Sequence, residues 1–297
     1  MILVVGGTGH LGVELVPILT AHGLRVRVLT RDPERARRLL GDIPEVALGD
    51  ARDLRSLEAA VNGIGAVVSA MTGFGPGGPG PRAVDYEGNL NLIQVCETAG
   101  ARRFVLVSMH GAAPDHPMEL LRRKHQAEEA LRASRLDWTI VRPTVFMELW
   151  AGIIGTPIAK SRKTTVFGRG DNPINFISAH DVARFVDLAL VEPGLSRQAV
   201  DVGGPENLTF NQLVREIEIA ASCTASVTHI PILLMRVSRL LLWPIRPDLA
   251  GMVEAGIITD TLDMTFNTTE LQRRFPQVEL TRVADSARRD FSAGRAP

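Results

Sequence analysis

The chain has 297 residues, 45% of them hydrophobic, and equal numbers of acidic and basic residues, so its formal net charge is zero. This length and composition suit a folded protein with a large core, which we expect to form one large domain and a smaller lobe. A neutral chain without a basic tail excludes partners that need many phosphates neutralised, namely nucleic acid and anionic membranes, and favours small-molecule chemistry.

Short apolar runs alternate with helical patterns along the first half of the chain. The expected strands are ILVVG, RVRVLT, EVAL, GAVVSA, RFVLVS and DWTIVR, at residues 2–6, 25–30, 45–48, 65–70, 103–108 and 137–142. This alternation predicts an α/β fold, a Rossmann-type doubly wound parallel sheet. In such a fold the ligand lies at the carboxyl ends of the strands.

A glycine motif follows the first strand directly. The sequence VVGGTGHLG, residues 4–12, places Gly6, Gly9 and Gly12 between that strand and the start of a helix. Glycine permits a tight turn and a close backbone approach, while the helix N-terminus presents N–H groups to a pyrophosphate. In this context the motif predicts a dinucleotide site rather than a plain glycine turn. The residues expected to bind the dinucleotide here are Gly6, Thr8, Gly9, His10, Leu11 and Gly12.

The end of the second strand bears on the choice of nucleotide. A site for NAD usually offers an acidic residue there, whereas a site for NADP offers an arginine. The segment VRVLTRDPER places Arg31 at this point, and Asp32 stands before Pro33, where we expect it to cap a helix. The sequence therefore favours NADPH over NADH as the cofactor. The alternative is that Arg31 is an ordinary solvated charge in an arginine-rich chain.

Two further segments of the first half are distinctive. GFGPGGPGP, residues 73–81, cannot form regular structure, and we expect either a mobile lid or a long connection at the ligand end of the sheet. MELLRRKHQAEEALRAS, residues 118–134, has the pattern of a helix. On this helix Lys124 falls on the apolar stripe that should face the core, with Leu120, Ala127 and Leu131.

The strict alternation fades after residue 150. We expect a dinucleotide-binding Rossmann domain over residues 1–150 and a smaller substrate-binding lobe over residues 151–297, with segments that return to the Rossmann core. TTVF, PINFI and AVDVGG are expected as strands of the second half, together with a helix from about Ser178 and another from Thr209. Both Ser178 and Thr209 are expected to cap their helices.

Other features concern cysteine chemistry and membranes. Cys96 and Cys223 lack the spacing of a metal site or a redox pair, so we expect two reduced core residues. Residues 229–245 are the most apolar stretch but are too short and too charged to span a membrane. We therefore expect an amphipathic helix that covers a pocket rather than a membrane anchor. No secretory signal opens the chain, and a cytoplasmic protein is expected.

The motifs of the chain resemble those of the atypical short-chain dehydrogenase/reductases of the NmrA-like group. They are GGTGHLG, LTRDPERA, ALGDARD, DYEGNLNLI, RFVLVS, RRKHQAEEALRAS, DWTIVRPTVFME, FISAHDVARF and DVGGPENLTF. The resemblance implies a seven-stranded Rossmann sheet with a small C-terminal substrate lobe. The further cofactor-binding positions it implies are Asp50 near the adenine, Ala70 and Met71 near the ribose and phosphate, and Pro143 to Val145 near the nicotinamide amide.

The resemblance also bears on Lys124. Related reductases carry a tyrosine four residues before a lysine on this helix; the tyrosine protonates the alkoxide, and the lysine holds the nicotinamide ribose. Lys124 matches the lysine, so the ribose hydroxyls are its expected partners. Leu120 occupies the tyrosine position, and the only tyrosine of the chain is Tyr86. Asp85 stands where extended members of the family contribute an asparagine.

Two residues, one at the end of the fifth strand and one just after it, could supply the proton in place of the missing tyrosine. Ser108 stands at the strand end, while the catalytic serine of extended members falls at His110, which is either a proton donor or a loop histidine. The candidate catalytic residues are therefore Lys124, Ser108 and His110. We expect a hydroxyl of the substrate, beside its carbonyl, to be the main proton donor, with Ser108 or His110 assisting it.

Two functions are compatible with these residues. The first is an NADPH-dependent reductase that transfers hydride to a ketone or quinone, with a bulky aromatic, polyketide-like substrate of antibiotic biosynthesis. The second is a regulator or assembly factor of the NmrA type that senses NAD(P) without turning it over. The retained Lys124 favours the first, and the missing tyrosine favours the second. Substrate identity and oligomeric state are left open.

Overall fold

The structure is a computed structural model that describes residues 1–42 and 44–292, and it divides into two compact units. The first unit comprises Met1–Pro143 and Val182–Val202, and the second comprises Thr144–Asp181 and Gly203–Pro297. The boundary expected at residue 150 lies inside helix α6 (Met147–Ser161) of the second unit. The two units are described separately below.

The first unit is built on a seven-stranded sheet in which every neighbouring pair is parallel. Its strands are β1 Ile2–Val5, β2 Val26–Thr30, β3 Glu45–Leu48, β4 Ala66–Ser69, β5 Arg103–Val107, β6 Asp137–Pro143 and β10 Gln198–Val202. Their order is β10-β6-β5-β4-β1-β2-β3. The Rossmann-type sheet and all six strands expected in the first half are thereby confirmed.

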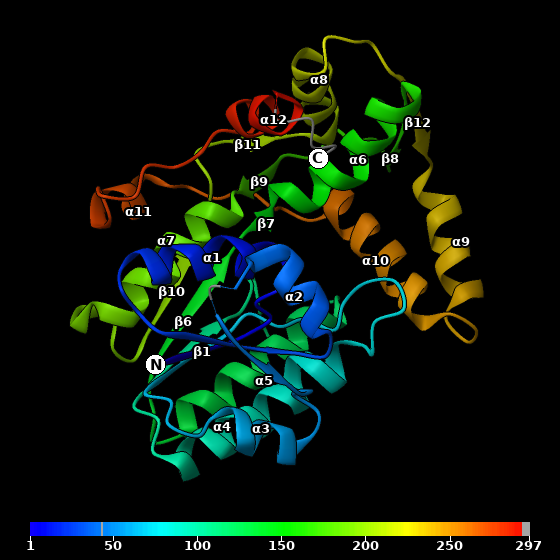
Figure 1. Cartoon of the computed structure of the whole chain (residues 1–297). Helices are drawn as coiled ribbons and strands as arrows, with labels where there is room; N and C mark the ends of the chain where they lie inside the picture. The colour runs from blue at the N-terminus through cyan, green and yellow to red at the C-terminus, as the bar shows by residue number, and fades with distance from the viewer. Residues whose placement is uncertain (43, 293–297) are drawn as a thin grey trace. The chain divides into compact units, whose positions relative to one another are not determined.

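Helices cover both faces of this sheet. They are α1 His10–Ala21, α2 Pro33–Leu40, α3 Leu54–Ala60, α4 Asn89–Ala99, α5 Glu119–Ala133 and α7 Ala179–Val191, with the π-helical segment η1 Arg82–Gly88 and the short 3-10 turn η2 Pro193–Leu195. Figure 1 shows α3, α4 and α5 on one face and α1 and α7 on the other. Such two-sided coverage explains why the inner strands are mainly apolar, most completely in β1, whose four residues are all apolar and buried.

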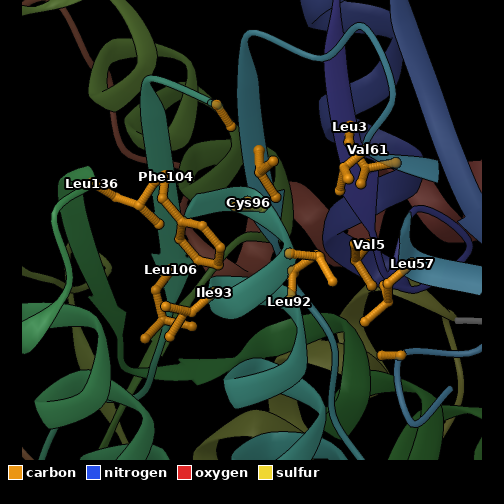
Figure 2. Close-up of a cluster of buried hydrophobic side chains, with 14 of the residues drawn as sticks. Leu3, Val5, Leu57, Val61, Leu92, Ile93, Cys96, Phe104, Leu106 and Leu136 are labelled. Carbon is orange, nitrogen blue, oxygen red and sulfur yellow. The ribbon is translucent and has the colours of Figure 1, made fainter. Parts of the chain in front are cut away.

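The core between the sheet and helices α3 and α4 is drawn in Figure 2. Successive side chains of a strand point to opposite faces, so Leu3 and Val5 of β1 face this layer together with Phe104 and Leu106 of β5. Cys96 of α4 is fully buried here, and burial raises the pKa of its thiol to about 12. Cys96 is thus the reduced core residue that its sequence context indicates, and both cysteines are free.

The second unit holds two small sheets and the remaining helices. One sheet has the order β11-β9-β7 and the other pairs β12 with β8. The strands are β7 Val145–Phe146, β8 Lys163–Phe167, β9 Ile174–Ile177, β11 Asn207–Leu208 and β12 Ser226–Ile230. The helices are α6, α8 Phe210–Ala220, α9 Ile232–Leu242, α10 Pro247–Thr261, α11 Thr269–Arg274 and α12 Val283–Ser292 (Figure 1).

Several expectations for the second half are confirmed. TTVF and PINFI lie in β8 and β9, and AVDVGG contains most of β10. Thr209 caps α8, where its side chain and that of Gln212 form a reciprocal capping box. Ser178 accepts a hydrogen bond from the backbone N–H of His180 at the start of α7. Cys223 is only half-buried, so its expected place in the core is wrong; the residue follows the end of α8 instead of lying within it.

Helix α9 carries several exposed large apolar side chains. Leu233, Leu240 and Leu241 are each more than half exposed, and Met235 is the residue of α9 that is buried. Among the helices of the described residues, none is both long and apolar enough to cross a membrane. The expected helix is confirmed, and its amphipathic role over a pocket stays a prediction.

Candidate active site

The glycine turn after β1 is shaped by backbone packing. Gly6 has a φ of +93°, a conformation that L side chains rarely adopt, and a Cβ on it would lie 2.5 Å from the carbonyl oxygen of Ala70. A Cβ on Gly12 would lie 2.3 Å from the Cα of Gly7. The backbone N–H of Ala70 also donates to the oxygen of Val5 at 2.8 Å. The end of β4, with Ala70 and Met71, therefore lies directly against this turn.

Gly9 differs from these two glycines because it faces open space. It is the N-cap of α1 with an ordinary φ of −86°, and no side chain caps the helix. A Cβ on Gly9 would meet only the oxygen of Gly6, at 3.4 Å. Glycine is thus not needed here for the fold, but it leaves the N–H groups at the start of α1 accessible to an anion. This arrangement fits a pyrophosphate on the helix N-terminus.

Positive charge gathers near the ends of β2 and β3. The Arg31 side chain is 65% exposed, and its Nη1 lies 4.0 Å from Oδ2 of Asp50. Asp50 is held more closely by Arg52, whose hydrogen bonds keep the pKa of the Asp50 carboxyl below its ordinary value. Desolvation and the nearby charge of Arg35 lower the pKa of His10. The guanidinium of Arg31 is therefore largely exposed, and Asp50, the carboxylate near it, is held more closely by Arg52 than by Arg31.

Asp32 has a structural role and is not the acidic residue that a site for NAD would offer at the end of β2. Its carboxylate accepts a hydrogen bond from the backbone N–H of Arg35 at 2.9 Å and caps α2, with Pro33 at the first position of the helix. The expected capping function is confirmed.

Lys124 is buried on α5 and has a partner within the protein. Its Nζ lies 3.0 Å from Oδ1 of Asp85, which is completely buried, and donates to the backbone oxygen of Val107 at 3.2 Å. The other carboxylate oxygen of Asp85 accepts from the backbone N–H of Gly73 at 2.8 Å. The ammonium is therefore fixed beside the end of β5. The sequence suggested the ribose hydroxyls as partners of Lys124, but it did not reveal Asp85.

Asp85 belongs to the π-helical segment η1, which the sequence did not predict. Asn89, at the start of α4, donates from its side-chain amide to the backbone oxygen of Asp85 at 2.8 Å and accepts from the hydroxyl of Ser69 at 2.7 Å. All three side chains are buried. π-Helical turns often occur at functional sites, and this one connects the end of β4 with the Asp85 carboxylate. In the sequence, the segment DYEGNLN pointed to Asp85 only because Asp85 stands where extended members of the family contribute an asparagine.

The loop at residues 73–81 is irregular, as expected, and is closed at its base. The backbone N–H of Gly80 donates to the oxygen of Gly73 at 3.2 Å, and Asp85 holds the N–H of Gly73. For the residues between Gly73 and Gly80, both interpretations, a mobile lid and a long connection, stay open.

Ser108 and His110 follow β5 and differ in accessibility. Ser108 is 4% exposed, and its hydroxyl has no hydrogen-bond partner among the described residues. The His110 side chain is 38% exposed, and its Nδ1 lies 2.9 Å from Oδ1 of Asp201 on β10. The backbone N–H of His110 donates to the oxygen of Pro143 at 2.8 Å. Leu120 on α5 is buried and apolar, so it offers no proton.

The carboxyl ends of the parallel strands thus bring most candidate residues of the first unit to one edge of the sheet. Asp50, Ala70 and Met71, Ser108 and His110, and Pro143 follow or end β3, β4, β5 and β6 respectively. Val145 belongs to the second unit, where it lies on β7 and pairs with Phe176. Asp201 and Asn89 are the site residues that sequence reasoning missed. No group of side chains among the described residues could hold a metal ion.

Comparison with known proteins identifies the family of the chain. The sequence pattern of the NAD(P)H-binding family matches residues 6–193. The chain is 33% identical over 224 residues to the NAD(P)H azoreductase of Xenophilus azovorans, covering 74% of each protein. It is 30% identical to the photosystem II assembly factor Ycf39 of a Synechocystis strain, over 80% of this chain and 73% of that protein.

A solved structure shares the fold across the whole chain. The NADPH-dependent quinone oxidoreductase of Escherichia coli, in complex with NADPH, matches with a TM-score of 0.77 at 21% identity, covering 98% of this chain and 100% of that chain. The resemblance drawn from the motifs is confirmed together with the fold that it implied. The chain therefore belongs to the NAD(P)H-binding family and carries an NAD(P)H-binding domain.

Proposed function

We propose that the chain is an NADPH-dependent reductase that transfers hydride to a quinone or ketone. The observation that carries this proposal is the buried ammonium of Lys124, held by Asp85 at the same edge of the sheet as the open glycine turn. A buried charge is costly unless it is paired, and Asp85 pairs this one; Lys124 also matches the lysine that holds the nicotinamide ribose in the reductases that the motifs resemble. The similarity to an NAD(P)H azoreductase supports the same reaction class.

The residues of the site have separate roles in this proposal. The N–H groups of α1 behind Gly9 bind the pyrophosphate, and Arg31 binds the 2′-phosphate through paired, charge-assisted hydrogen bonds. Lys124 orients the ribose. When bound, NADPH supplies the hydride. The ends of β5 and β6 then position the acceptor, and alignment of reactants alone can contribute several kcal/mol to the rate.

The acceptor is a bulky aromatic ketone or quinone of the polyketide type. Because Leu120 replaces the proton-donating tyrosine, substrates whose carbonyl is already polarised by conjugation or by a neighbouring hydroxyl are the ones this site can reduce. The azo and quinone chemistry in the names of the azoreductase and the quinone oxidoreductase supports an aromatic acceptor.

A direct assay tests the proposal. Purified protein is incubated with NADPH or NADH and with a hydroxylated naphthoquinone, an aromatic ketone or a simple aliphatic ketone. We expect one NADPH oxidised per molecule of aromatic acceptor reduced, with slower oxidation of NADH. The matched control is Gly9→Val, which fills the open space at the helix N-terminus and should abolish both binding and turnover. NADPH binding without oxidation, whatever the acceptor, would contradict the proposal.

That contrary result is the signature of the second candidate function, an NAD(P)H-sensing regulator or assembly factor. Two observations favour it: Leu120 stands in the tyrosine position, and the chain is similar to the assembly factor Ycf39. A sensor needs Gly9 and Arg31 but has no use for a proton donor beside the nicotinamide. The residues around His110 therefore distinguish the two functions.

A further inference from the structure

We propose that His110 is the proton donor of the reduction and that Asp201 is the positioning residue that holds its ring. This inference rests on the proposed reductase function and deepens it. It also replaces the expectation that the substrate carries most of the proton work. The pairing of these two residues is a feature of the fold because they are far apart in the sequence.

The position of His110 is fixed from two sides. Its backbone N–H donates to the oxygen of Pro143, the last residue of β6, at 2.8 Å. Its Nδ1 lies 2.9 Å from Oδ1 of Asp201, near the carboxyl end of β10. Since β5, β6 and β10 are parallel neighbours, all three ends lie at the edge of the sheet where ligands bind in this fold. Lys124 donates to Val107, three residues before His110.

Asp201 is well placed to control the ring chemistry of His110. It pairs in register with Arg142 on β6, and the two side chains attract each other electrostatically. A carboxylate beside Nδ1 orients the imidazole ring and, after proton transfer, retains the remaining proton on Nδ1. The transferable proton is therefore the one on Nε2, on the other side of the ring.

The other candidate donors are less suitable. The hydroxyl oxygen of Ser108 is buried without solvent access, so a substrate cannot reach it in this structure. Leu120 carries no proton to give. The His110 ring is 38% exposed, and it combines access to solvent with a fixed orientation. A proton donor that is used once per turnover needs both, because it must be reprotonated from water.

The step balances as a two-electron reduction. Hydride addition to the carbonyl carbon breaks the carbon–oxygen π bond and leaves its electron pair on oxygen. The Nε2–H bond of the His110 imidazolium breaks, and that proton forms the new O–H bond. The products are the alcohol, the oxidised nucleotide and a neutral imidazole, which takes up one proton from solvent. The net change consumes one reduced nucleotide and one proton per carbonyl.

The experiment compares His110→Ala, Asp201→Asn and Asp201→Glu with a matched control, His22→Gln. His22 forms a second histidine–aspartate pair of the first unit, with Asp187 at 3.1 Å, at the C-terminal end of α1. Steady-state kinetics give kcat and KM, and fluorescence gives the affinity for NADPH. Added imidazole tests chemical rescue of His110→Ala. Nitrogen NMR of the His110 ring reports its tautomer independently of activity.

We expect His110→Ala to lose about a hundredfold or more in kcat while NADPH affinity stays within about twofold, since a positioned acid contributes on the order of 10²–10⁴. Imidazole should restore part of this loss. Asp201→Asn should lower kcat and move the ring proton away from Nδ1, whereas Asp201→Glu should recover part of the activity. His22→Gln should match wild type.

Three results would overturn the inference. One is wild-type kcat in His110→Ala with all acceptors. Another is a loss of kcat with aromatic ketones that lack a neighbouring hydroxyl but not with hydroxylated acceptors, which would make the substrate the main proton donor. The third is an unchanged His110 tautomer in Asp201→Asn. In each of these cases wild-type protein still reduces an acceptor, so the proposed function stands. If wild type reduces none, the proposed function itself fails.

Discussion

At the scale of single residues, the buried pair formed by Lys124 and Asp85 leads to a stability prediction. Removing one partner of a buried ion pair leaves an uncompensated charge and costs about 3–5 kcal/mol. We therefore expect Lys124→Met to lower the free energy of unfolding by that amount, because Asp85 is completely buried. The double variant Lys124→Met/Asp85→Asn should recover most of the loss, since its asparagine can still accept from Gly73.

Urea denaturation of the two single variants and the double variant measures this coupling. The control is Arg123→Met on the same helix, which removes the partly exposed pair with Glu119 and should cost at most about 1 kcal/mol. Additive losses in the double variant would show that Lys124 and Asp85 do not stabilise each other. NADPH should bind the double variant more weakly than wild type even where its stability is restored.

Arg31 carries the choice between the two nucleotides. Because a guanidinium can grip a phosphate with two hydrogen bonds, Arg31→Ala should weaken NADPH binding by about tenfold or more and leave NADH binding within about twofold. Calorimetric titration of wild type and variant with both nucleotides measures the difference. Equal losses for the two nucleotides, or a wild type that prefers NADH, would remove Arg31 from the 2′-phosphate site.

Sequence reasoning recovered some site residues and missed others for a physical reason. Lys124 and the glycine turn were visible because helical spacing and a strand–turn–helix context are local patterns. Asp201 was not, because its partner His110 lies 91 residues earlier and the two meet only through the order of strands in the sheet. Asn89, at the start of helix α4, was hidden in the same way, since its partner Ser69 lies at the end of strand β4.

At the scale of elements, the glycine turn contains one glycine that the fold requires, Gly6, and one that we expect only dinucleotide binding to require, Gly9. Gly6→Ala should destabilise the fold, because its φ of +93° and the contact with Ala70 leave no room for a Cβ. Gly9→Val should fold with nearly wild-type stability, since its backbone is ordinary and the space beside it is open. It should nevertheless lose dinucleotide binding, because its side chain would stand in front of the helix N-terminus.

Thermal unfolding with and without NADPH checks both variants in one experiment. The midpoint for Gly6→Ala should fall by several degrees, as expected for a loss of about 1–3 kcal/mol. Gly9→Val should keep the wild-type midpoint but show no rise on addition of NADPH. Stabilisation of Gly9→Val by NADPH would place the pyrophosphate elsewhere.

The elements of the first unit could be predicted, and those of the second only in part. Strands buried on both faces give mainly apolar runs, as in β1 and β4, and together with the alternating helices these runs identify the six strands from β1 to β6. The π-helical turn η1 could not be predicted, because its bonding depends on Asp85 and Asn89 finding partners on neighbouring elements. Two-residue strands such as β7 and β11 are too short to show any periodicity.

At the scale of the whole molecule, the same fold accommodates an enzyme and a cofactor sensor. Both would bind NADPH at the glycine turn, gain thermal stability from it and depend on Arg31. Only the enzyme needs His110, Asp201 and a carbonyl substrate at the ends of β5, β6 and β10. Binding experiments therefore cannot separate the two functions, and a measurement of transferred hydrogen can.

That measurement uses NADPH deuterated at the reactive carbon of the nicotinamide. Wild-type protein is mixed with this nucleotide and a hydroxylated naphthoquinone or aromatic ketone, and the product is analysed by mass spectrometry. The reductase account predicts one deuterium in each molecule of reduced ketone and a rate that falls about a hundredfold or more in His110→Ala. For a quinone, whose transferred hydrogen can exchange with water, it predicts stoichiometric oxidation of the nucleotide instead. Tight binding of NADPH with neither deuterium transfer nor oxidation would contradict the account.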